Sequence, residues 1–465
     1  MNKEVTFALY FGNRGFFPGE LIADARRELA QAVTDAGYGY LMADEEMTRY
    51  GAVETIQEGK RYAAFLEEHR GEFQGVILCL PNFGDENGAM VALENCNVPI
   101  LVEAYRDEAG KMDFTHRRDA VCGKIAMCNV LRQHKLRYTL FEPFACNPTD
   151  PEFAAHIEKF AAVCRVVNGM KRFNIGAIGA RTTAFKTVRF DEIAMQGVGV
   201  NVETIDLSEV FARMEQAGAE RVEQKTADYL RITDFGSFPP HKLETIARIG
   251  VVVDDLIQEY DLQGIALRCW NEFETTFGVA PCLVLCDLNE RGIAASCELD
   301  VNNTVMTRAI LLAAAHPAML LDVNNNYGTD PDRCILFHCG PVPISMTKGK
   351  GVTIEHLMFR KSFGEGSGVG VNKVQIAPGP VTFGSLRTEA GRLCAFVSEG
   401  ELTEDPIEEA FFGSGIVLKK DNVQGLLKYM GTNGFRHHVC LTKGHVAEAV
   451  QEALINYLGY DLDRV

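Results

Sequence analysis

Short apolar runs alternate with longer amphipathic stretches along the first third of the chain. The run VTFALYF at 5–11 is followed by a stretch whose apolar residues recur at helical spacing and which ends on Gly37. Because such runs are continuous rather than alternating, and helices separate them, they predict a parallel sheet covered on both faces. We expect this N-terminal α/β domain to span residues 1–170. Its further strands are expected at 75–80, 99–105 and 139–144.

A second unit of the same kind is expected to begin near residue 171, where FNIGAIGA follows a helical stretch. From about residue 345 the pattern changes to short strand-like runs broken by Gly and Pro, which is typical of a small β-barrel or sandwich. The predicted fold is therefore α/β: two Rossmann-like parallel-sheet domains, the central one over 171–345, and then a β-rich, barrel-like C-terminal domain over 346–465 with a terminal helix. Apolar runs of the central domain lie at 201–210, 265–270, 281–288, 318–324 and 334–340.

The chain is acidic, with 46 Lys and Arg against 63 Asp and Glu in 465 residues and a net charge of −17. Without clustered basic runs, such a chain is a poor candidate for binding nucleic acid or an anionic membrane. No stretch approaches the roughly 20 apolar residues that cross a bilayer, and the first residues lack the pattern of a signal peptide. The 14 cysteines, none in a C-x-x-C pair, are typical of the reducing cytoplasm. We expect a cytoplasmic protein whose partner is a small molecule.

Acidic and imidazole side chains gather at the ends of apolar runs in the second half of the chain. Glu298 and Asp322 each end such a run, with room between them for one helix and a return strand. Strands joined in this way place their C-terminal ends at one edge of an open α/β sheet, where ligands bind. His338 ends the following run, and the pair His437–His438 precedes the last helix.

Two carboxylates with one or two imidazoles suit a hard-to-borderline divalent ion, Mn²⁺ first, with Mg²⁺ or Co²⁺ as substitutes. Each residue also has a simpler interpretation. A carboxylate at a strand end is commonly a helix cap or a loop hydrogen-bond acceptor. His338 could equally be a core histidine, and the His-His pair could be ordinary loop polarity. The residues alone leave both interpretations open.

A series of motifs in a fixed order resembles the L-fucose isomerase and L-arabinose isomerase superfamily, and most closely its fucose-isomerase-like members. The similarity runs from the first predicted strand to the last helix, and it implies a subunit with two α/β domains followed by a β-rich domain. The motifs are GNRGFFP at 12–18, ARTTAFKTVRFDE at 180–192, CWNEFE at 269–274, CELD at 297–300, LLDVN at 320–324, FHCG at 337–340, PGPVT at 378–382 and HHVCLTKG at 437–444.

The resemblance implies that Glu298, Asp322 and His438 hold Mn²⁺ and that the two carboxylates flank the reacting carbons. His438 is preferred over His437 because its spacing to Gly444 fits the family pattern better. These residues suit aldose–ketose isomerisation, in which a proton moves between adjacent carbons of an open-chain sugar. A divalent ion stabilises the developing enediolate, and two carboxylates act as base and acid. Which carboxylate starts as the base depends on the configuration of the sugar.

Three further residues have roles implied by the resemblance. His338 matches a position that is an additional metal ligand in the arabinose-isomerase branch. Arg14 lies in a Gly-rich loop that, in hexameric relatives, reaches the sugar site of a neighbouring subunit; its alternative roles are loop solvation or an intersubunit ion pair. Trp270 could form a platform for the sugar or anchor the core. We therefore expect a homo-oligomer, a hexamer by resemblance.

The sugar itself is open between L-fucose, arabinose and a 6-substituted hexose such as sulfoquinovose. A local basic cluster would favour a sugar with an acidic group if it faced the pocket, although a solvated surface is the simpler interpretation. Two alternative functions also remain: a non-catalytic cytoplasmic sugar-binding or regulatory protein on the same scaffold, and a metal-dependent sugar epimerase. The basic cluster comprises Arg181, Lys186 and Arg189.

Overall fold

The computed structural model describes residues 4–411 and 413–464. Contacts within the chain divide it into two compact units. The N-terminal unit comprises the described residues up to Asn168 together with Gln451–Leu458, and the larger unit comprises Gly169–Val450 with the described residues from Gly459 onward. The central and C-terminal stretches thus lie in one unit, and their division into two domains at residue 345 stays a prediction.

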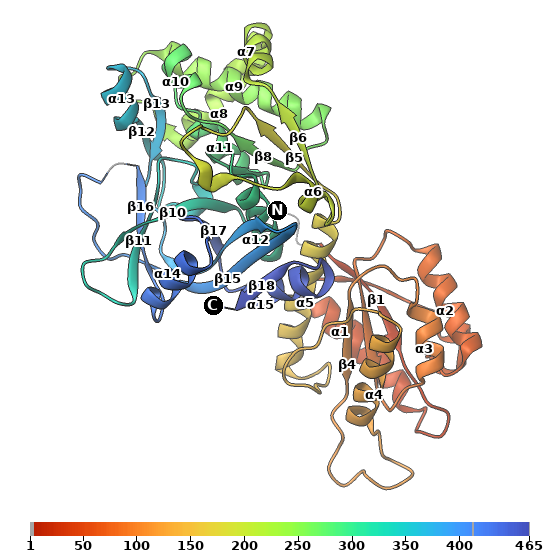
Figure 1. The fold of residues 1–465 in the computed structure, drawn as a ribbon. Coiled ribbons are helices and arrows are strands. Elements are labelled where there is room, and N and C mark those ends of the chain that lie inside the picture. Colours follow the sequence, from red (N-terminus) through yellow and green to blue (C-terminus); the bar gives the residue numbers. More distant parts are fainter. Residues whose placement is uncertain (1–3, 412, 465) are drawn as a thin grey trace. The chain divides into compact units, whose positions relative to one another are not determined.

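The N-terminal unit is built on a parallel four-stranded sheet in the order β2-β1-β3-β4 (Figure 1). Every residue of β3 and β4 is buried, which explains the continuous apolar runs that predicted them. The strands are β1 (Thr6–Phe11), β2 (Gly39–Met42), β3 (Gly75–Leu80) and β4 (Ile100–Ala104). The helices are α1 (Leu21–Asp35), α2 (Ile56–Glu68), α3 (Glu86–Leu93), α4 (Ala120–Gln133) and most of α5 (Pro151–Met170).

The prediction of a strand at 139–144 is wrong. Of these residues, only Thr139 forms a β-bridge, to Leu101, and residues 140–144 belong to no strand. Pro143 lacks the backbone N–H that a further ladder bond requires, so the apolar residues of this stretch pack without extending the sheet. The π-helical turn Glu452–Tyr457 packs here, with the Tyr457 hydroxyl 2.9 Å from Oγ1 of Thr139.

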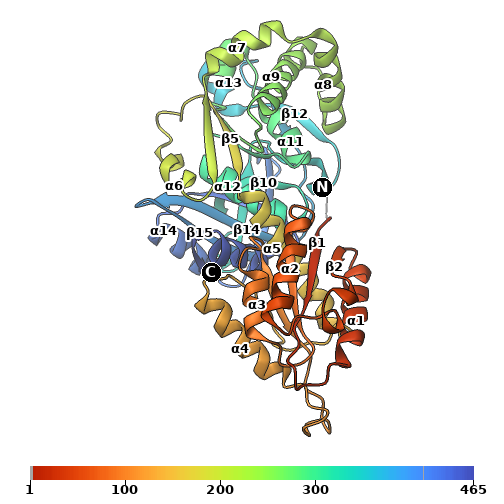
Figure 2. The same cartoon turned by 90° about the vertical axis from the view of Figure 1, so that its right-hand side faces the viewer.

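The larger unit begins with a second parallel sheet in the order β6-β5-β8-β9. Figure 2 shows α7, α8 and α9 packed together at one end of this unit. The strands are β5 (Phe173–Ile178), β6 (Val200–Ile205), β8 (Gly264–Leu267) and β9 (Ala294–Ser296). The helices are α6 (Glu192–Gln196), α7 (Leu207–Gln216), α8 (Ala219–Ile232), α9 (Pro240–Glu259), α10 (Glu272–Phe277) and α11 (Cys282–Glu290).

The apolar run at 281–288, which has the continuous pattern of a buried strand, is the helix α11. It begins after Pro281, and its residues Cys282–Asn289 are all buried. A helix that is buried on every side has apolar residues on every side, so its sequence shows the same continuous run as a buried strand. Periodicity therefore gave no signal that separates the two structures here.

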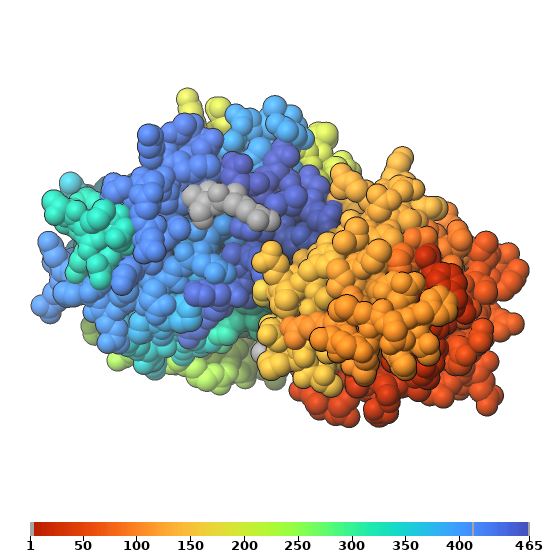
Figure 3. Space-filling view, turned by 90° about the horizontal axis from the view of Figure 1, so that it is seen from below, coloured from red at the N-terminus to blue at the C-terminus, as the bar shows by residue number. Residues whose placement is uncertain are grey.

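The predicted β-rich, barrel-like region is confirmed. Its strands pair antiparallel in a closed ring, in the order β14, β17, β10, β11, β16, β15 and back to β14, and β18 adds parallel to β15. In the space-filling view, the blue C-terminal residues form one continuous face of this unit (Figure 3). The strands are β10 (Ala318–Asn326), β11 (Arg333–His338), β14 (Gly379–Glu389), β15 (Arg392–Thr403), β16 (Ser414–Lys419), β17 (His438–Lys443) and β18 (Asp461–Arg464).

Smaller elements complete this unit. A separate three-stranded sheet has the order β13-β12-β7 and comprises β7 (Thr233–Asp234), β12 (Gly351–Glu355) and β13 (Val369–Lys373). The remaining helices are α13 (Leu357–Phe363), α14 (Val423–Thr432) and α15 (Ala447–Gln451). Among the residues that the structure describes, no helix is both long and apolar enough to cross a membrane.

Helix α12 (Val301–Ala314) connects the second parallel sheet to the barrel. It packs against β8 and β9 on one side and against β10, β14 and β17 on the other, and nearly all of its residues are buried. Its N-cap is Asp300, whose side chain accepts a hydrogen bond from the Asn303 backbone N–H. Glu298 lies just before the start of this helix, and β10 begins after its end and returns along it, so Asp322, the fifth residue of β10, comes back toward Glu298.

Candidate active site

Two of the candidate residues face each other across neighbouring barrel strands. Asp322 on β10 is paired in register with His438 on β17. Cross-strand neighbours point to the same face of a sheet, and here the Nε2 atom of His438 lies 3.4 Å from Oδ1 of Asp322. His338, the last residue of β11, lies on the next strand of the barrel. The barrel therefore brings Asp322, His338 and His438 together.

Glu298 reaches this group from the parallel sheet, not from the barrel. The prediction that Glu298 and Asp322 end strands of one parallel sheet is wrong, because β9 and β10 belong to different sheets and Asp322 lies within its strand. The side chains nevertheless converge. The Oε2 atom of Glu298 lies 3.5 Å from Nε2 of His338 and 3.8 Å from Nε2 of His438.

A left-handed turn aims Glu298 at the barrel. Glu298 and Leu299 have φ angles of 53° and 62°, a conformation that costs L-residues on the order of 1–3 kcal/mol each. Backbone hydrogen bonds hold the turn: the Leu299 N–H donates to Leu267 O at 3.2 Å, and the Asp300 N–H donates to Cys297 O at 3.0 Å. Strain of this kind, held by the surrounding structure, is typical of functional sites.

The two carboxylates each have a buried oxygen without a hydrogen-bond donor among the described residues, Oε2 of Glu298 and Oδ1 of Asp322. Burial raises the pKa of the Asp322 carboxyl, against the lowering effect of His338 and His438. Unsatisfied buried carboxylate oxygens are costly, and a cation between them and the facing imidazole nitrogens would remove that cost. The residues present therefore fit a divalent metal ion.

Four groups of possible metal ligands lie among the described residues: Cys297–His338–Cys339 and Cys269–Cys297–Glu298 include thiols, and the other two share His438. Within each group, one ligand atom from every residue lies within 4.8 Å of the others. Of the two groups that share His438, the first is Glu298, His338 and His438, and the second is Asp322, His437 and His438. His437, which sequence spacing ranked below His438, thus also lies at the site, with Nε2 3.8 Å from Oδ1 of Asp322.

Asp300 orients the shared imidazole. The Nδ1–H of His438 donates to Oδ2 of Asp300 at 2.8 Å, and Asp300 also pairs with the buried guanidinium of Arg436 and accepts from Nδ2 of Asn303 at 2.8 Å. Although burial opposes ionisation, Arg436 and His438 lower the pKa of Asp300 to about 2. The ionised carboxylate holds the proton on Nδ1, so in the neutral form of His438 the Nε2 lone pair points at the carboxylates.

His338 has a different hydrogen-bond pattern. Its Nδ1 accepts the N–H of Cys339 at 2.9 Å, so the proton of the neutral ring resides on Nε2, which faces Glu298. Burial opposes protonation, but Cys339 and Glu298 outweigh it and raise the pKa of His338 well above its usual value. A ring with its proton on Nε2 can attract the Glu298 carboxylate across 3.5 Å but offers no lone pair there to a metal, and the predicted ligand role of His338 stays a prediction.

These residues line a cavity of about 420 Å³. Its other walls are mainly aromatic: the ring of Phe185 lies 5.6 Å from that of Trp270 and 5.8 Å from that of His438. Trp270 therefore lines the cavity, and its role as a platform for the sugar stays a prediction. The residues of the basic cluster, Arg181, Lys186 and Arg189, are not among the described residues that line the cavity. The remaining lining residues are Asn324, Phe337, Cys339, His356, Met358, Glu408, Ala410, Phe411 and His437.

Sequence reasoning did not identify Asp300, Arg436, Cys339 or Phe185 as parts of the site. Three of them had a weak local signal, because Asp300 follows Glu298 in CELD, Arg436 precedes the His-His pair, and Cys339 follows His338. The fourth, Phe185, lies in the motif ARTTAFKTVRFDE, where the basic residues were considered instead.

Arg14 lies in the N-terminal unit, in the loop after β1. Its Nη2 is 3.2 Å from Oε2 of Glu86, and its guanidinium lies 4.1 Å above the centre of the Phe83 ring. These contacts lie within one unit, so the role of Arg14 at a sugar site stays a prediction.

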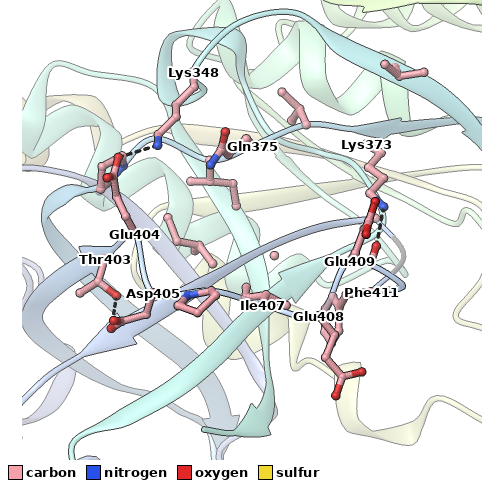
Figure 4. A pocket seen from close by; sticks show the side chains of 18 residues that line it. Lys348, Lys373, Gln375, Thr403, Glu404, Asp405, Ile407, Glu408, Glu409 and Phe411 are labelled. Carbon is pink, nitrogen blue, oxygen red and sulfur yellow. Dashed lines mark hydrogen bonds and ion pairs between the residues drawn. The ribbon is translucent and has the colours of Figure 1, made fainter.

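A larger cavity, of about 640 Å³, lies beside the segment 403–416 (Figure 4). Its two lysines are already engaged: Lys348 Nζ lies 2.5 Å from Oε1 of Glu404, and Lys373 Nζ lies 3.5 Å from the Glu409 carbonyl oxygen. Figure 4 shows these two pairs on opposite sides of the cavity. The volume of a cavity therefore does not identify the candidate active site, because the unsatisfied carboxylate oxygens and the imidazoles line the smaller cavity.

Several curated proteins are similar to this chain over most of its length. The sulfoquinovose isomerase of Alkalicoccus urumqiensis is 23% identical over 407 residues, which cover 84% of this chain and 86% of that protein. The sulfoquinovose isomerase of Priestia megaterium is 22% identical over 400 residues, covering 83% and 85%. A solved periplasmic solute-binding protein of Actinobacillus succinogenes with bound D-allose aligns over 67% of this chain at 10% identity, but its TM-score of 0.17 supports no structural conclusion.

Two family models match the chain at its two ends. The N-terminal domain of fucose/sulfoquinovose isomerase matches residues 8–171, and the C-terminal domain of L-fucose isomerase matches residues 336–465. The two matches cover the N-terminal sheet and most of the barrel, including His338 and His438. Taken with the relatives, they show that the chain belongs to the fucose/sulfoquinovose isomerase family of sugar isomerases.

Proposed function

We propose that this protein is a metal-dependent aldose–ketose isomerase that moves a proton between adjacent carbons of an open-chain sugar. The observation that carries the proposal is the pair of unsatisfied carboxylate oxygens, Oε2 of Glu298 and Oδ1 of Asp322, which both face Nε2 of His438. Family membership supports the reaction class, and the donor set supports the metal dependence.

Glu298, Asp322 and His438 would hold the metal ion. Two carboxylate oxygens and an imidazole nitrogen suit Mn²⁺, with Mg²⁺ or Co²⁺ as substitutes. When bound, the ion supplies positive charge that stabilises the negative charge developing on the substrate oxygens. Asp300 contributes by fixing the tautomer and the orientation of His438.

The carboxylate pair carries the proton transfer. One carboxylate removes the proton from the first carbon as a base, and the other delivers a proton to its neighbour as an acid. Burial raises the pKa of Asp322, which helps this carboxyl to hold a proton as the acid partner must. His338, whose Nε2 lies 3.5 Å from Oε2 of Glu298, supports that carboxylate by electrostatic attraction and is the candidate for a further metal ligand.

The side chains of the cavity wall would contact and position the sugar. Aromatic faces such as those of Phe185 and Trp270 pack well against the C–H surfaces of a sugar and exclude water from the reacting carbons. The names of the relatives favour a 6-sulfonated hexose. The described lining residues contain one carboxylate, Glu408, besides Glu298 and Asp322, and neither Lys nor Arg. A sulfonate would therefore need a cation from elsewhere, such as Arg14 of another copy in the proposed homo-hexamer.

An aldose panel tests the proposal. The Mn²⁺-loaded protein is incubated with L-fucose, L- and D-arabinose and 6-sulfoquinovose, and ketose formation is measured. We expect one of these aldoses to be converted. Tight sugar binding that is indifferent to a chelator and yields no ketose would contradict an isomerase and favour a sugar-binding protein, whereas an epimeric aldose as the product would favour an epimerase.

A further inference from the structure

Four buried thiols lie directly behind the metal-binding residues, and we call them the thiol cluster: Cys269, Cys282, Cys297 and Cys339. All four are free cysteines. The Sγ atoms of Cys282 and Cys339 are 3.7 Å apart. On its other side, Sγ of Cys339 lies 3.3 Å from Nδ1 of His338, and Cys269 Sγ lies 3.5 Å from Oε1 of Glu298. The cluster thus contacts two residues of the site, although the proposed reaction uses none of its sulfurs.

We propose that Cys339 and Cys282 form an oxidative modification site, at which an oxidant of the peroxide class that enters through the sugar cavity forms a disulfide and switches the enzyme off. Cys339 lines the cavity and is 7% exposed. Cys282 is 2% exposed and is absent from the described wall of the cavity. A small oxidant therefore meets Cys339 first, and Cys282 stands behind it as the resolving thiol.

The chemistry proceeds in two steps with hydrogen peroxide. The sulfur of Cys339 attacks one peroxide oxygen: the S–O bond forms, the O–O bond breaks, and the other oxygen leaves as water, which gives a sulfenic acid. The sulfur of Cys282 then attacks the sulfenic sulfur, the S–S bond forms, and the oxygen leaves as a second water. The two thiol protons end on the two waters. The sulfurs lose two electrons in total, and the peroxide gains them.

The geometry explains why this bond would affect the site. An S–S bond is about 2.05 Å long, so the two sulfurs must approach by roughly 1.7 Å from their present contact at 3.7 Å. Cys282 lies in the first turn of the buried helix α11, which is anchored one turn later by Cys286, whose Sγ donates to the Val342 carbonyl oxygen at 2.6 Å. The movement therefore falls mainly on Cys339, at the end of β11.

Movement of Cys339 is transmitted to its neighbour. The Cys339 N–H donates to Nδ1 of His338, so a shift of Cys339 away from the cavity pulls that imidazole with it. The contact of His338 with Glu298, now 3.5 Å, then lengthens. Because a misplacement of about 1 Å near reacting groups can cost on the order of 100-fold in rate, we expect a loss of that size in the cross-linked enzyme.

Peptide mapping of the Mn²⁺-loaded, full-length protein tests the proposal. The protein is treated with hydrogen peroxide, remaining thiols are alkylated, and disulfide-linked peptides are identified. We expect a Cys282–Cys339 linked peptide that appears in step with the loss of isomerase activity, and both should be reversed by dithiothreitol. Activity loss with oxidation only at the exposed Cys122 would overturn the proposal. A linked peptide between Cys339 and Cys297, which lies within 4.8 Å of it, would overturn the choice of Cys282.

Two matched alanine variants on α11 sharpen the test. Cys282→Ala should keep its activity before oxidation and form no cross-link. Without the resolving thiol, the sulfenic acid of Cys339 is expected to proceed to sulfinic acid, so dithiothreitol should no longer restore activity. Cys286→Ala, one turn further along the helix, keeps both reacting sulfurs and should still form the Cys282–Cys339 cross-link. Full recovery of oxidised Cys282→Ala would contradict the proposal. Because the peptide map needs no turnover, it remains decisive even if the proposed isomerase activity fails.

Discussion

The Nδ1 atom of His438 lies 2.8 Å from Oδ2 of Asp300, a residue that begins a buried helix and is itself completely buried. This contact joins the barrel strand β17 to the turn that carries Glu298. Because Asp300 accepts the hydrogen bond from Nδ1–H, the opposite nitrogen of His438 faces both Glu298 and Asp322. The geometry of the whole donor set therefore depends on a residue that touches neither the cavity nor the proposed metal ion.

Replacing Asp300 by Asn should weaken metal binding. An Asn still caps helix α12, but it removes the charge that fixes the tautomer of His438. We expect Mn²⁺ affinity, measured by electron paramagnetic resonance, to fall by about 10- to 100-fold. Unpairing the buried Arg436 should also cost on the order of 3–5 kcal/mol in the free energy of unfolding, so affinity is measured on protein shown to be folded.

The matched control is Asp206→Asn, which changes another helix N-cap of the same unit, far along the chain from the site. It should leave Mn²⁺ affinity unchanged. If folded Asp300→Asn also bound Mn²⁺ as tightly as the unsubstituted protein, the orienting role of Asp300 would be wrong.

The two histidines of the first donor group should differ in their effect on metal affinity. The Nε2 lone pair of His438 is available to a metal, whereas the neutral ring of His338 carries its proton on Nε2. We expect His438→Gln to lower Mn²⁺ affinity by more than about 100-fold and His338→Gln by less than about tenfold. Titration calorimetry measures both. Equal losses in the two variants would show that His338 is a ligand as well.

Metal removal should abolish turnover reversibly. Treatment with a chelator followed by dialysis should leave folded, inactive protein, because backbone hydrogen bonds hold the strand of Asp322 and the turn of Glu298 without a metal. Stepwise addition of Mn²⁺ should restore ketose formation, and Mg²⁺ or Co²⁺ should restore part of it. Circular dichroism controls for folding. Unchanged turnover by protein shown by elemental analysis to be free of metal would speak against metal dependence.

The buried carboxyl of Glu274 should make the free energy of unfolding depend on pH. Burial raises its pKa to about 9, and neither of its oxygens has a hydrogen-bond partner among the described residues. The folded state therefore holds a proton that the unfolded state releases above pH ~4.3, so this group destabilises the fold progressively as pH rises from ~4.3 toward 9.

Glu274→Gln should remove this dependence. In metal-free protein, we expect the variant to gain on the order of 3 kcal/mol relative to the unsubstituted protein at pH 7 and little at pH 4.5. Urea unfolding at several pH values measures the difference, and Glu215→Gln, on the exposed face of α7, is the matched control. A gain that is the same at both pH values would mean that Glu274 is not held protonated.

Much of the site could be predicted from local sequence, and the reasons for the exceptions are physical. Asp322 and His338 follow from apolar runs that really are strands, and His438 follows from a motif. The apolar run at 281–288 did not reveal the helix α11, because a fully buried helix and a buried strand have the same apolar composition. The left-handed turn at Glu298 and Leu299 has no glycine to indicate it.

Contacts between residues far apart in the chain could not be predicted from the local sequence. Asp300 has the ordinary appearance of an N-cap, and that interpretation is correct. Its second role depends on His438, which is brought beside it only by the pairing of β17 with β10 and β14. Likewise, Glu298 and Asp322 were expected on one sheet edge, yet they meet because α12 packs a parallel sheet against a barrel. Tertiary register decides such contacts, and the spacing of residues in the sequence does not contain it.

Turnover by Glu298→Gln and Asp322→Asn tests the carboxylate pair most directly. Each substitution keeps the shape of the side chain and removes its ability to exchange a proton at the carbon. Ketose formation is measured at saturating Mn²⁺, with binding confirmed for each variant and Glu215→Gln as the control. Our account predicts that kcat falls by about 100- to 10,000-fold in both variants while the fold is retained. Metal-loaded Glu298→Gln that turns over like the unsubstituted protein would contradict it.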